Sequence, residues 1–320
     1  MSLSLSNVSF IKSPMNYTGG KYKLLPQILP LFPENVSFFY DVFTGGGNVA
    51  VNAKANKIVA SDICEPIIDL YNYFLSKKKE KIFKEIESAI AFFGLSDTTK
   101  NGYDFYGAES SSGLASVNRE AYKKLKKFYN EKLRCSFSRN ILFYLLIVFG
   151  FNNQIRFNKS GGFNMPVGKR DFNKNNQKNL THFLARLHEG NISFLKKDYA
   201  SLALPDEEDE GFSSLEDVFV YCDPPYLITT ASYNENGGWS ESDEKKLLEF
   251  LLSLHNKGVK FALSNVLESK GKKNNLLIEW IKKNGFNAHS LNATYAHSSY
   301  HGKNKDKKTL EVLVTNYSLG

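Results

Sequence analysis

Cysteine is scarce in this sequence, and long hydrophobic runs are absent. Only three of the 320 residues are cysteine (Cys64, Cys135 and Cys222), and none has the spacing of a metal-ligand pair. We therefore expect reduced thiols in an intracellular, cytoplasmic protein without a metal site. The longest apolar run, residues 141–149, is far below the ~20 residues that cross a membrane, so it predicts a buried helix. No signal-peptide pattern is found.

The composition is that of a globular, basic protein. Hydrophobic residues make up 42% of the chain, which excludes a disordered polypeptide. The length of 320 residues predicts one large or two modest domains with a sizeable core. The net charge of +8 suits a polyanionic partner, although the acidic run at residues 206–210 offsets part of it.

The stretch Asp223-Pro224-Pro225-Tyr226 is the central candidate for an active site. It follows the apolar residues 218–222, which predict a buried strand, and open α/β sheets bind ligands at the carboxyl ends of their strands. The prolines stiffen the turn and leave carbonyls free to accept hydrogen bonds. Two acceptors beside a flat ring suit a planar group with an exocyclic NH2, such as adenine or cytosine. An ordinary turn with a packed tyrosine is the alternative.

A glycine-rich turn between two predicted strands indicates a nucleotide site. Residues 38–43 and 57–60 predict the strands, and a helix is expected after the turn at residues 44–50. The turn matches the G-x-G-x-x-A dinucleotide pattern through Gly45, Gly47 and Ala50. That pattern suits NAD, FAD or S-adenosylmethionine (SAM) alike.

Two charged residues near this turn could hold the ligand. Asp62, just past the second strand, could accept hydrogen bonds from both ribose hydroxyls. Lys21 follows two glycines and precedes an amphipathic stretch, where exposed N–H groups favour an anion such as a carboxylate or phosphate. The alternatives are a surface aspartate that caps the next helix and a plain join between loop and helix.

The middle of the chain is basic and has a different pattern. Residues 77–93 predict a basic amphipathic helix, residues 96–116 a loop, and residues 121–134, with five lysines and an arginine, another helix. Residues 151–166 predict a hairpin with a Gly-Gly turn. Its aromatic, amide and arginine side chains are of the kinds that wedge between bases and read base edges. For the lysines alone, a solvated helix face is the alternative.

The α/β pattern resumes after residue 180. Strands are expected at residues 191–195, 259–263 and 311–316. Helices are expected at residues 240–255, where Ser240 and Asp243 form a capping box, and at residues 276–283. The loops expected between them are residues 206–214, residues 227–238 with Tyr233 and Trp239, and residues 294–308 with Tyr300 and His301.

Four of these motifs, in this order, resemble those of the Dam-type DNA adenine-N6 methyltransferases, the D12 class of the α group. They are residues 17–21, the turn at residues 43–47, Asp62 and the tetrapeptide at residues 223–226. The resemblance covers nearly the whole chain. It implies methyl transfer from SAM to N6 of an adenine that is flipped out of duplex DNA.

The resemblance also implies an α/β fold with two domains. A Rossmann-like sheet of the SAM-dependent methyltransferase type would comprise residues 1–70 and 182–320. An inserted, mainly helical target-recognition domain with a β-hairpin would comprise residues 71–181.

The same resemblance assigns roles to individual residues. The catalytic residues are Asp223, Pro224, Pro225 and Tyr226. Those expected to contact SAM are Tyr17, Lys21, Phe43, Gly45, Gly47, Asp62, Asp198, Tyr199 and Asp223. Those expected to contact DNA are Phe151, Asn152, Gln154, Arg156, Asn164 and Pro166. Among the last group Phe151 would wedge into the base stack, Asn152 would meet the orphaned partner base and Arg156 would read a guanine.

The sequence departs from the family pattern at three positions. Val42 stands where proline is usual, Gln154 where GATC-specific relatives have an aliphatic residue, and Asn16 where some have a guanine-contacting lysine. These changes leave the chemistry in place but argue against strict GATC specificity. A guanine-reading Arg156 beside a flipped adenine allows GATC or a related site such as CATG.

The expected partners are double-stranded DNA and, in a restriction–modification system, a cognate restriction endonuclease. One active site in one chain suggests a monomer, and no membrane association is expected. Three alternatives stay open at this point: a nicotinamide-dependent oxidoreductase, a non-catalytic DNA-binding protein, and methylation of N4-cytosine or of RNA.

Overall fold

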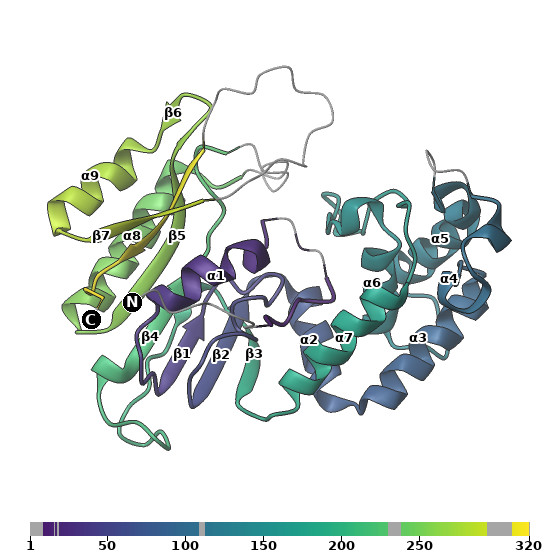
Figure 1. Ribbon diagram of the computed structural model, residues 1–320, viewed down its shortest axis with the longest axis horizontal. Helices are drawn as coiled ribbons and strands as arrows, with labels where there is room; N and C mark the ends of the chain where they lie inside the picture. Colours follow the sequence, from purple (N-terminus) through teal and green to yellow (C-terminus); the bar gives the residue numbers. More distant parts are fainter. Residues whose placement is uncertain are drawn as a thin grey trace, which may run out of the picture. The chain divides into compact units, whose positions relative to one another are not determined.

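The computed structural model describes residues 9–15, 17, 19–108, 113–229, 238–292 and 309–319. They divide into two compact units (Figure 1). The sheet unit comprises Lys21–Thr44, Asn52–Ile63 and Asn191–Gly320. The helical unit comprises Met1–Gly20, Gly45–Val51 and Cys64–Gly190.

A mostly parallel sheet forms the centre of the sheet unit, which gives the mixed α/β fold that was predicted. Its strand order is β3-β2-β1-β4-β5-β8-β7, and β6 pairs with the end of β5. The strands are β1 (Phe38–Asp41), β2 (Lys57–Asp62), β3 (Ile192–Lys196), β4 (Val218–Cys222), β5 (Lys260–Ser269), β6 (Lys272–Lys273), β7 (Asn287–Leu291) and β8 (Leu310–Thr315). Strands β1 to β5 run parallel, whereas β8 runs antiparallel to both β5 and β7. The strand order reverses at β1, and this is where such sheets bind ligands.

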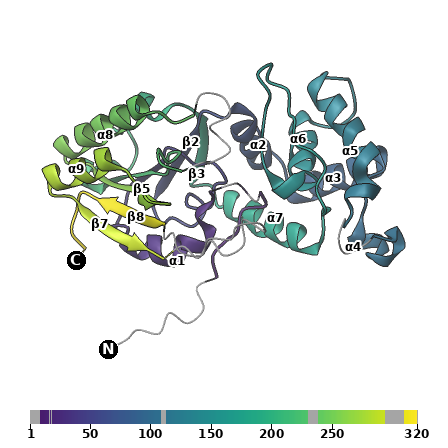
Figure 2. The ribbon, with the colours of Figure 1, turned by 90° about the horizontal axis from the view of Figure 1, so that it is seen from above.

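Both faces of this sheet are buried. Side chains along a strand point alternately to opposite sides, so alternate residues of the central strands pack on each face. On one face Phe38 and Val220 belong to a hydrophobic cluster with Leu251 of α8 (Glu241–Asn256). On the other face Phe219 meets Phe32 with ring centroids 4.7 Å apart. Figure 2 shows α8 and α9 (Asn275–Asn284) on one side of the sheet and α1 (Leu25–Ile28) on the other. Short 3-10 turns complete the unit: η1 (Lys21–Leu24), η2 (Leu29–Leu31), η5 (Tyr199–Ser201) and η6 (Leu215–Asp217).

The helical unit is built around α6 (Arg139–Val148), whose residues from Ile141 to Val148 are all buried. This confirms the buried helix that the apolar run predicted. Helix α6 packs against α2, α3 and α5. The other helices and 3-10 turns of the unit are α2 (Glu65–Ser76), α3 (Lys79–Phe93), α4 (Thr98–Asn101), α5 (Ala115–Asn130), α7 (Lys174–Leu187), η3 (Asp104–Tyr106) and η4 (Phe151–Asn153). Across the described ranges, no helix is long and apolar enough to cross a membrane.

Three expectations about secondary structure were wrong. The segment after the glycine-rich turn forms turns and not a helix. Its asparagines and the β-branched Val49 and Val51 favour helix weakly, and a single helix-type bond, from Val51 N to Gly47 O (3.2 Å), forms at its start. The loop expected at residues 96–116 contains α4 and η3, and α5 begins within it. Strand β7 was not expected because it is polar; as an edge strand it pairs only with β8 and is mostly exposed.

Candidate active site

The tetrapeptide Asp223-Pro224-Pro225-Tyr226 begins where β4 ends. All five residues of β4 are buried, and the strand lies between β1 and β5. Parallel pairing sets Asp41 of β1 beside Tyr221 of β4, so the carboxyl ends of both strands reach the same edge of the sheet. Asp223 therefore emerges at the edge where the sequence predicted a ligand site.

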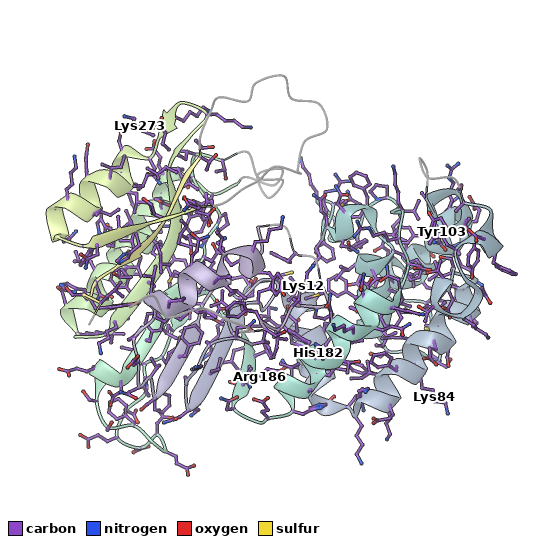
Figure 3. The ribbon with its side chains drawn as sticks, in the orientation of Figure 1. Lys12, Lys84, Tyr103, His182, Arg186 and Lys273 are labelled. Carbon is purple, nitrogen blue, oxygen red and sulfur yellow. The ribbon has the colours of Figure 1, made fainter. Side chains whose placement is uncertain are left out.

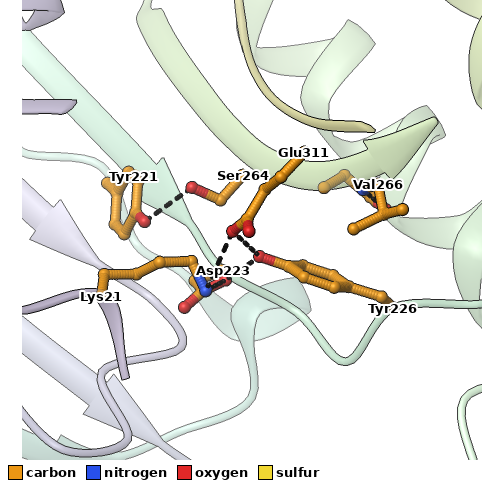
Figure 4. A network of polar contacts seen from close by, with 8 residues as sticks. Lys21, Tyr221, Asp223, Tyr226, Ser264, Val266 and Glu311 are labelled. Atoms are coloured by element: carbon orange, nitrogen blue, oxygen red, sulfur yellow. Dashed lines mark hydrogen bonds and ion pairs between the residues drawn. The ribbon is translucent and has the colours of Figure 1, made fainter. Parts of the chain in front are cut away.

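Lys21, Asp223, Tyr226 and Glu311 form one polar network at this edge (Figure 4). The Nζ atom of Lys21 lies 2.8 Å from Oδ1 of Asp223 and 3.7 Å from Oε1 of Glu311. The Tyr226 hydroxyl lies 3.1 Å from Oδ1 of Asp223 and 3.0 Å from Oε1 of Glu311, so it donates to one of them at a time. Lys21 and Glu311 are 4% and 0% exposed, which leaves Asp223 (18%) as the most accessible charge in the network.

Burial sets the protonation of the acidic groups near this edge. It raises the pKa of Asp223, and the nearby Lys21 ammonium group opposes that rise. It also raises the pKa of Asp41 from 3.8 to about 8, with a further contribution from the charge of Asp223. Asp41 Oδ1 and Thr44 Oγ1 are buried, and neither has a hydrogen-bond partner among the residues described. Two buried polar atoms without a close partner at the start of a glycine-rich turn are candidates for contact with a polar ligand or a bound water.

Aromatic rings lie next to this edge in the sheet unit. The rings of Phe43 and Tyr199 are tilted by 30° with centroids 5.2 Å apart, and Trp239 meets Phe43 edge-on at 6.0 Å. The Trp239 indole N–H donates to Glu244 Oε2 at 2.6 Å, which fixes its ring. The Asp198 carboxylate accepts from Ala200 N at 2.9 Å and so begins the turn that carries Tyr199. The structure thus brings Phe43 and Tyr199 into contact with each other, and their contact with SAM stays a prediction.

Asp62 is the last residue of β2 and is half-buried. Backbone pairing between Thr44 N and Ser61 O (2.9 Å) holds the start of the glycine-rich turn against the end of this strand. The sequence prediction placed Asp62 at this position, and its contact with a ribose stays a prediction.

Tyr17 covers the glycine-rich turn within the helical unit. A Cβ atom at Gly45 would lie 2.9 Å from a ring carbon of Tyr17, and one at Gly46 would lie 2.8 Å from its Cβ. Gly45 also has a φ of +43°. The hydroxyl of Tyr71 donates to the Gly45 carbonyl at 2.8 Å. Glycine is therefore needed here for contact with Tyr17 as well as for backbone conformation.

The expected hairpin exists in a shorter form, within the helical unit. Phe157 and Phe163 form an antiparallel bridge, supported by the bond from Asn164 N to Arg156 O (3.0 Å). The first residues are not extended as expected: Phe151–Asn153 forms the 3-10 turn η4, with Asn152 at a φ of +52°. Such a φ is tolerated best by glycine and asparagine, which explains the break.

The residues predicted to contact DNA occupy both ends of this hairpin. Phe151 is 44% exposed, and its N–H donates to the Pro166 carbonyl at 2.9 Å. Arg156 Nε donates to Asn164 Oδ1 at 2.6 Å, so the expected guanine reader is already held by its neighbour. Gln154 is half-buried. Their roles toward DNA stay predictions.

Sequence reasoning missed three acidic residues near the site: Asp41, Glu244 and Glu311. Each is fully buried or nearly so. For Asp41 and Glu311 the sequence did contain a signal, because each is a carboxylate within an apolar run, which indicates a buried charge with a function. The expectations for Asn16, Tyr233, Tyr300 and His301 fall outside the described residues.

Known proteins resemble this chain closely. A family model for the D12 class N6 adenine-specific DNA methyltransferases matches residues 17–297. The Type II methyltransferase M.FokI of Planomicrobium okeanokoites is 39% identical over 317 residues, which are 97% of this chain and 43% of that protein. The modification methylase StsI of Streptococcus sanguinis is 39% identical over 98% of this chain and 44% of its own length.

The DNA adenine methylase of Vibrio cholerae serotype O1 is 26% identical over 257 residues, or 78% of this chain and 80% of that protein. The chain thus spans less than half the length of the first two relatives and most of the length of the third.

Proposed function

Because the chain belongs to the D12 class of N6 adenine-specific DNA methyltransferases, we propose that it methylates N6 of an adenine flipped out of duplex DNA. SAM, when bound, supplies an electrophilic methyl group. Family membership argues against the nicotinamide-dependent oxidoreductase. A non-catalytic DNA-binding protein and methylation of N4-cytosine or RNA remain alternatives that the experiment below tests.

The geometry of Asp223 carries this proposal. Its Oδ1 already accepts from Lys21 and Tyr226, and no described residue is hydrogen-bonded to Oδ2. Oδ2 and the Pro224 carbonyl are thus the acceptors proposed for the two N6 hydrogens. Holding both hydrogens turns the nitrogen lone pair toward the methyl donor and stabilises the positive charge that develops on N6. Once N6 carries the methyl group it is positively charged and acidic, so one of its two protons passes to solvent water.

The residues at the glycine-rich turn fit SAM. The unpartnered Oδ1 of Asp41 is an acceptor for the ammonium group at the methionine end. The paired rings of Phe43 and Tyr199 are proposed to lie beside the adenine, while Asp62 ends β2 at the usual place for a ribose contact. The further residues proposed to contact SAM are Tyr17, Lys21, Gly45, Gly47 and Asp198.

Residues 71–181 are proposed as the target-recognition domain. The hairpin supports this assignment, since it carries an exposed aromatic ring, amides and an arginine. The proposed DNA contacts are Phe151, Asn152, Gln154, Arg156, Asn164 and Pro166. Because two relatives are named as modification methylases, a role in restriction–modification, with a cognate endonuclease as the partner, is part of the proposal.

The test is to incubate the purified protein with SAM and unmethylated plasmid and to map modified bases by single-molecule sequencing. N6-methyladenine in one short motif is the expected result. Asp223→Ala should abolish turnover and leave most of the DNA affinity. Asp223→Asn, which keeps the shape, should lower kcat at least about a hundredfold, as removal of one charge-stabilising group does elsewhere.

Asp206→Asn in the exposed acidic loop is the matched control and should keep wild-type activity. Near wild-type activity of Asp223→Ala would show that this mechanism is wrong. SAM binding without any modified base would instead favour the non-catalytic alternative.

A further inference from the structure

Strand β5 extends well beyond its neighbour β4. The two pair from Phe219 and Lys260 to Cys222 and Leu263, but β5 continues to Ser269 and turns back as β6. Six residues of strand span about 20 Å. The resulting β5–β6 hairpin (residues 264–273) therefore projects from the same edge of the sheet at which Asp223 emerges (Figure 1).

The tip of the β5–β6 hairpin is strongly basic. Lys270, Lys272 and Lys273 are all exposed, and no salt bridge to any of them occurs in the described part of the chain. Figure 3 shows Lys273 on this hairpin. The negative residue opposite Lys273 is Glu268, which pairs with it across the strands without an ion pair within 4 Å.

The base of the hairpin is fixed to the sheet unit. Asn274 is 1% exposed and donates from Nδ2 to Glu244 Oε1 at 2.9 Å. Its backbone N–H donates to Leu267 O at 2.9 Å, and its side chain accepts from Leu277 N to cap α9. The lysines are therefore presented from a rigid base and not from a free loop.

A hollow of about 400 Å³ lies beside the hairpin and adjoins the catalytic tetrapeptide. Its lining includes Lys272 and Lys273 of the hairpin and Thr229, which lies three residues after Tyr226. Thr229 is tied to the carbonyl of Tyr226, since both its N–H and its hydroxyl donate to that oxygen at 3.2 Å.

We propose that the β5–β6 hairpin holds the phosphate backbone of the DNA strand that carries the target adenine, with its phosphates beside Lys272 and Lys273. This rests on the proposed function, which places the flipped base at Tyr226. The phosphates flanking that nucleotide must pass close to Tyr226, and the hollow is the adjoining basic surface. Lysine binds phosphate as a point charge, and phosphate contacts position the protein on the duplex. Glu241 lies in the same hollow and repels phosphate, so the backbone lies toward the lysine side.

The chain offers a matched control at the other end of α9. This helix ends near the amino ends of the parallel strands. Strand β7 follows it and starts opposite Thr315 of β8, and Thr315 in turn lies opposite Ala262, near the start of β5. Lys282 and Lys283 are exposed there. Lys272→Gln/Lys273→Gln and Lys282→Gln/Lys283→Gln therefore remove the same charge at opposite edges of the sheet.

The experiment measures the affinity for a plasmid-derived duplex from 50 to 300 mM salt, together with SAM affinity and methyl incorporation. Lys272→Gln/Lys273→Gln should bind DNA about 5- to 30-fold more weakly, and the slope of log K against log salt should fall by about one to two. SAM affinity should be unchanged. The control variant should match the wild type in all three measurements.

Equal salt slopes for the two variants, in a protein that still methylates DNA, would overturn this inference and leave the proposed function intact. A wild-type protein that binds SAM but no DNA would overturn both. Weaker binding of DNA by both variants to the same degree would also contradict the inference, since it would reflect net charge alone.

Discussion

At the scale of single residues, Glu311 shows how a fully buried carboxylate can influence a partly buried one. It lies on β8 between hydrophobic neighbours and is 0% exposed. Its charge raises the pKa of Asp223, while Lys21, which both carboxylates share, lowers it. Glu311 also accepts from the Tyr226 hydroxyl, so it positions both residues that the mechanism uses.

Glu311→Gln should shift the acid limb of the pH–rate profile to lower pH. The amide keeps an acceptor for Tyr226 but removes the negative charge that raises the pKa of Asp223. Asp223 then stays ionised, and able to accept the N6 hydrogens, at lower pH. Steady-state kcat measured from pH 5 to 9 tests this, with the exposed Glu249→Gln on α8 as the control. A shift to higher pH, or the same shift in Glu249→Gln, would contradict the role given to Glu311.

Asp41→Asn should flatten the pH dependence of stability. The pKa of Asp41 is raised from 3.8 to about 8, so between these values the folded protein holds a proton that the unfolded chain has released. The free energy of unfolding of the wild type therefore falls as pH rises through this range, by at most about 1.4 kcal/mol per pH unit for one proton. Below pH 4 and above pH 8 this group adds no slope.

Urea unfolding of the two proteins from pH 4 to 9, without SAM, tests the prediction for Asp41. The variant should gain stability relative to the wild type as pH rises, since a neutral amide has no charge to desolvate. Parallel pH profiles for the two proteins would show that Asp41 is ionised in the folded state. The pKa shift was not predictable from the sequence, because it depends on burial and on Asp223, which is distant in the chain.

At the scale of elements, the helices and strands with a strong hydrophobic or capping pattern were predicted correctly, and those with a weak pattern were not. Helix α6 was predictable because its residues are apolar from Ile141 onward, and β4 because it is a continuous apolar run that ends just before Asp223 and two prolines. The capping box at Ser240 and Asp243 marked the start of α8 correctly. Strand β7 has no such pattern and depends on pairing with β8, which local sequence cannot reveal. The order of motifs located the candidate site, but the partners of Lys21 depend on the tertiary fold.

The short hairpin at residues 157–163 depends on one side chain of α5. Asn130 Nδ2 donates to the Phe163 carbonyl at 3.0 Å, and its Oδ1 accepts from Phe163 N–H at 2.8 Å. Phe157 and Phe163 form the bridged pair of this short hairpin, and the other bridge that the structure describes in the segment, Gly150 with Val167, lies at its base. Asn130 therefore completes the backbone pairing that a longer strand would have supplied.

Asn130→Ala should loosen this hairpin and weaken its reading of DNA. Loss of two hydrogen bonds should lower the free energy of unfolding by about 1–2 kcal/mol and speed amide exchange at residues 156–164. Preference for the target site over other sequences should fall, with SAM affinity unchanged. Asn284→Ala is the control, because it removes one hydrogen bond that a side-chain amide makes at the end of α9. Unchanged exchange at residues 156–164 would show that the hairpin is held by its own contacts.

At the scale of the whole molecule, the net charge is +8. For the proposed binding of DNA, the position of the positive side chains matters more than their number. Four exposed lysines lie on or directly after α5: Lys123, Lys124, Lys127 and Lys132. Four others are exposed near the amino ends of the parallel strands: Lys54, Lys257, Lys282 and Lys283. Replacing either set by glutamine lowers the net charge equally. If DNA is attracted only by net charge, both quadruple variants should weaken binding to the same extent.

The α5 variant should instead weaken binding far more than the other, and to the same degree at every sequence. Phosphate contacts carry no sequence information, so the ratio of target to non-target affinity should be preserved. Each lost phosphate contact should reduce the slope of log K against log salt by about 0.9, so the α5 variant should lose up to about three to four units of slope. Fluorescence anisotropy with target and scrambled duplexes, at several salt concentrations, measures both quantities. A selective loss at the target site would mean that these lysines read bases, and equal slopes in the two variants would mean that α5 does not lie against DNA.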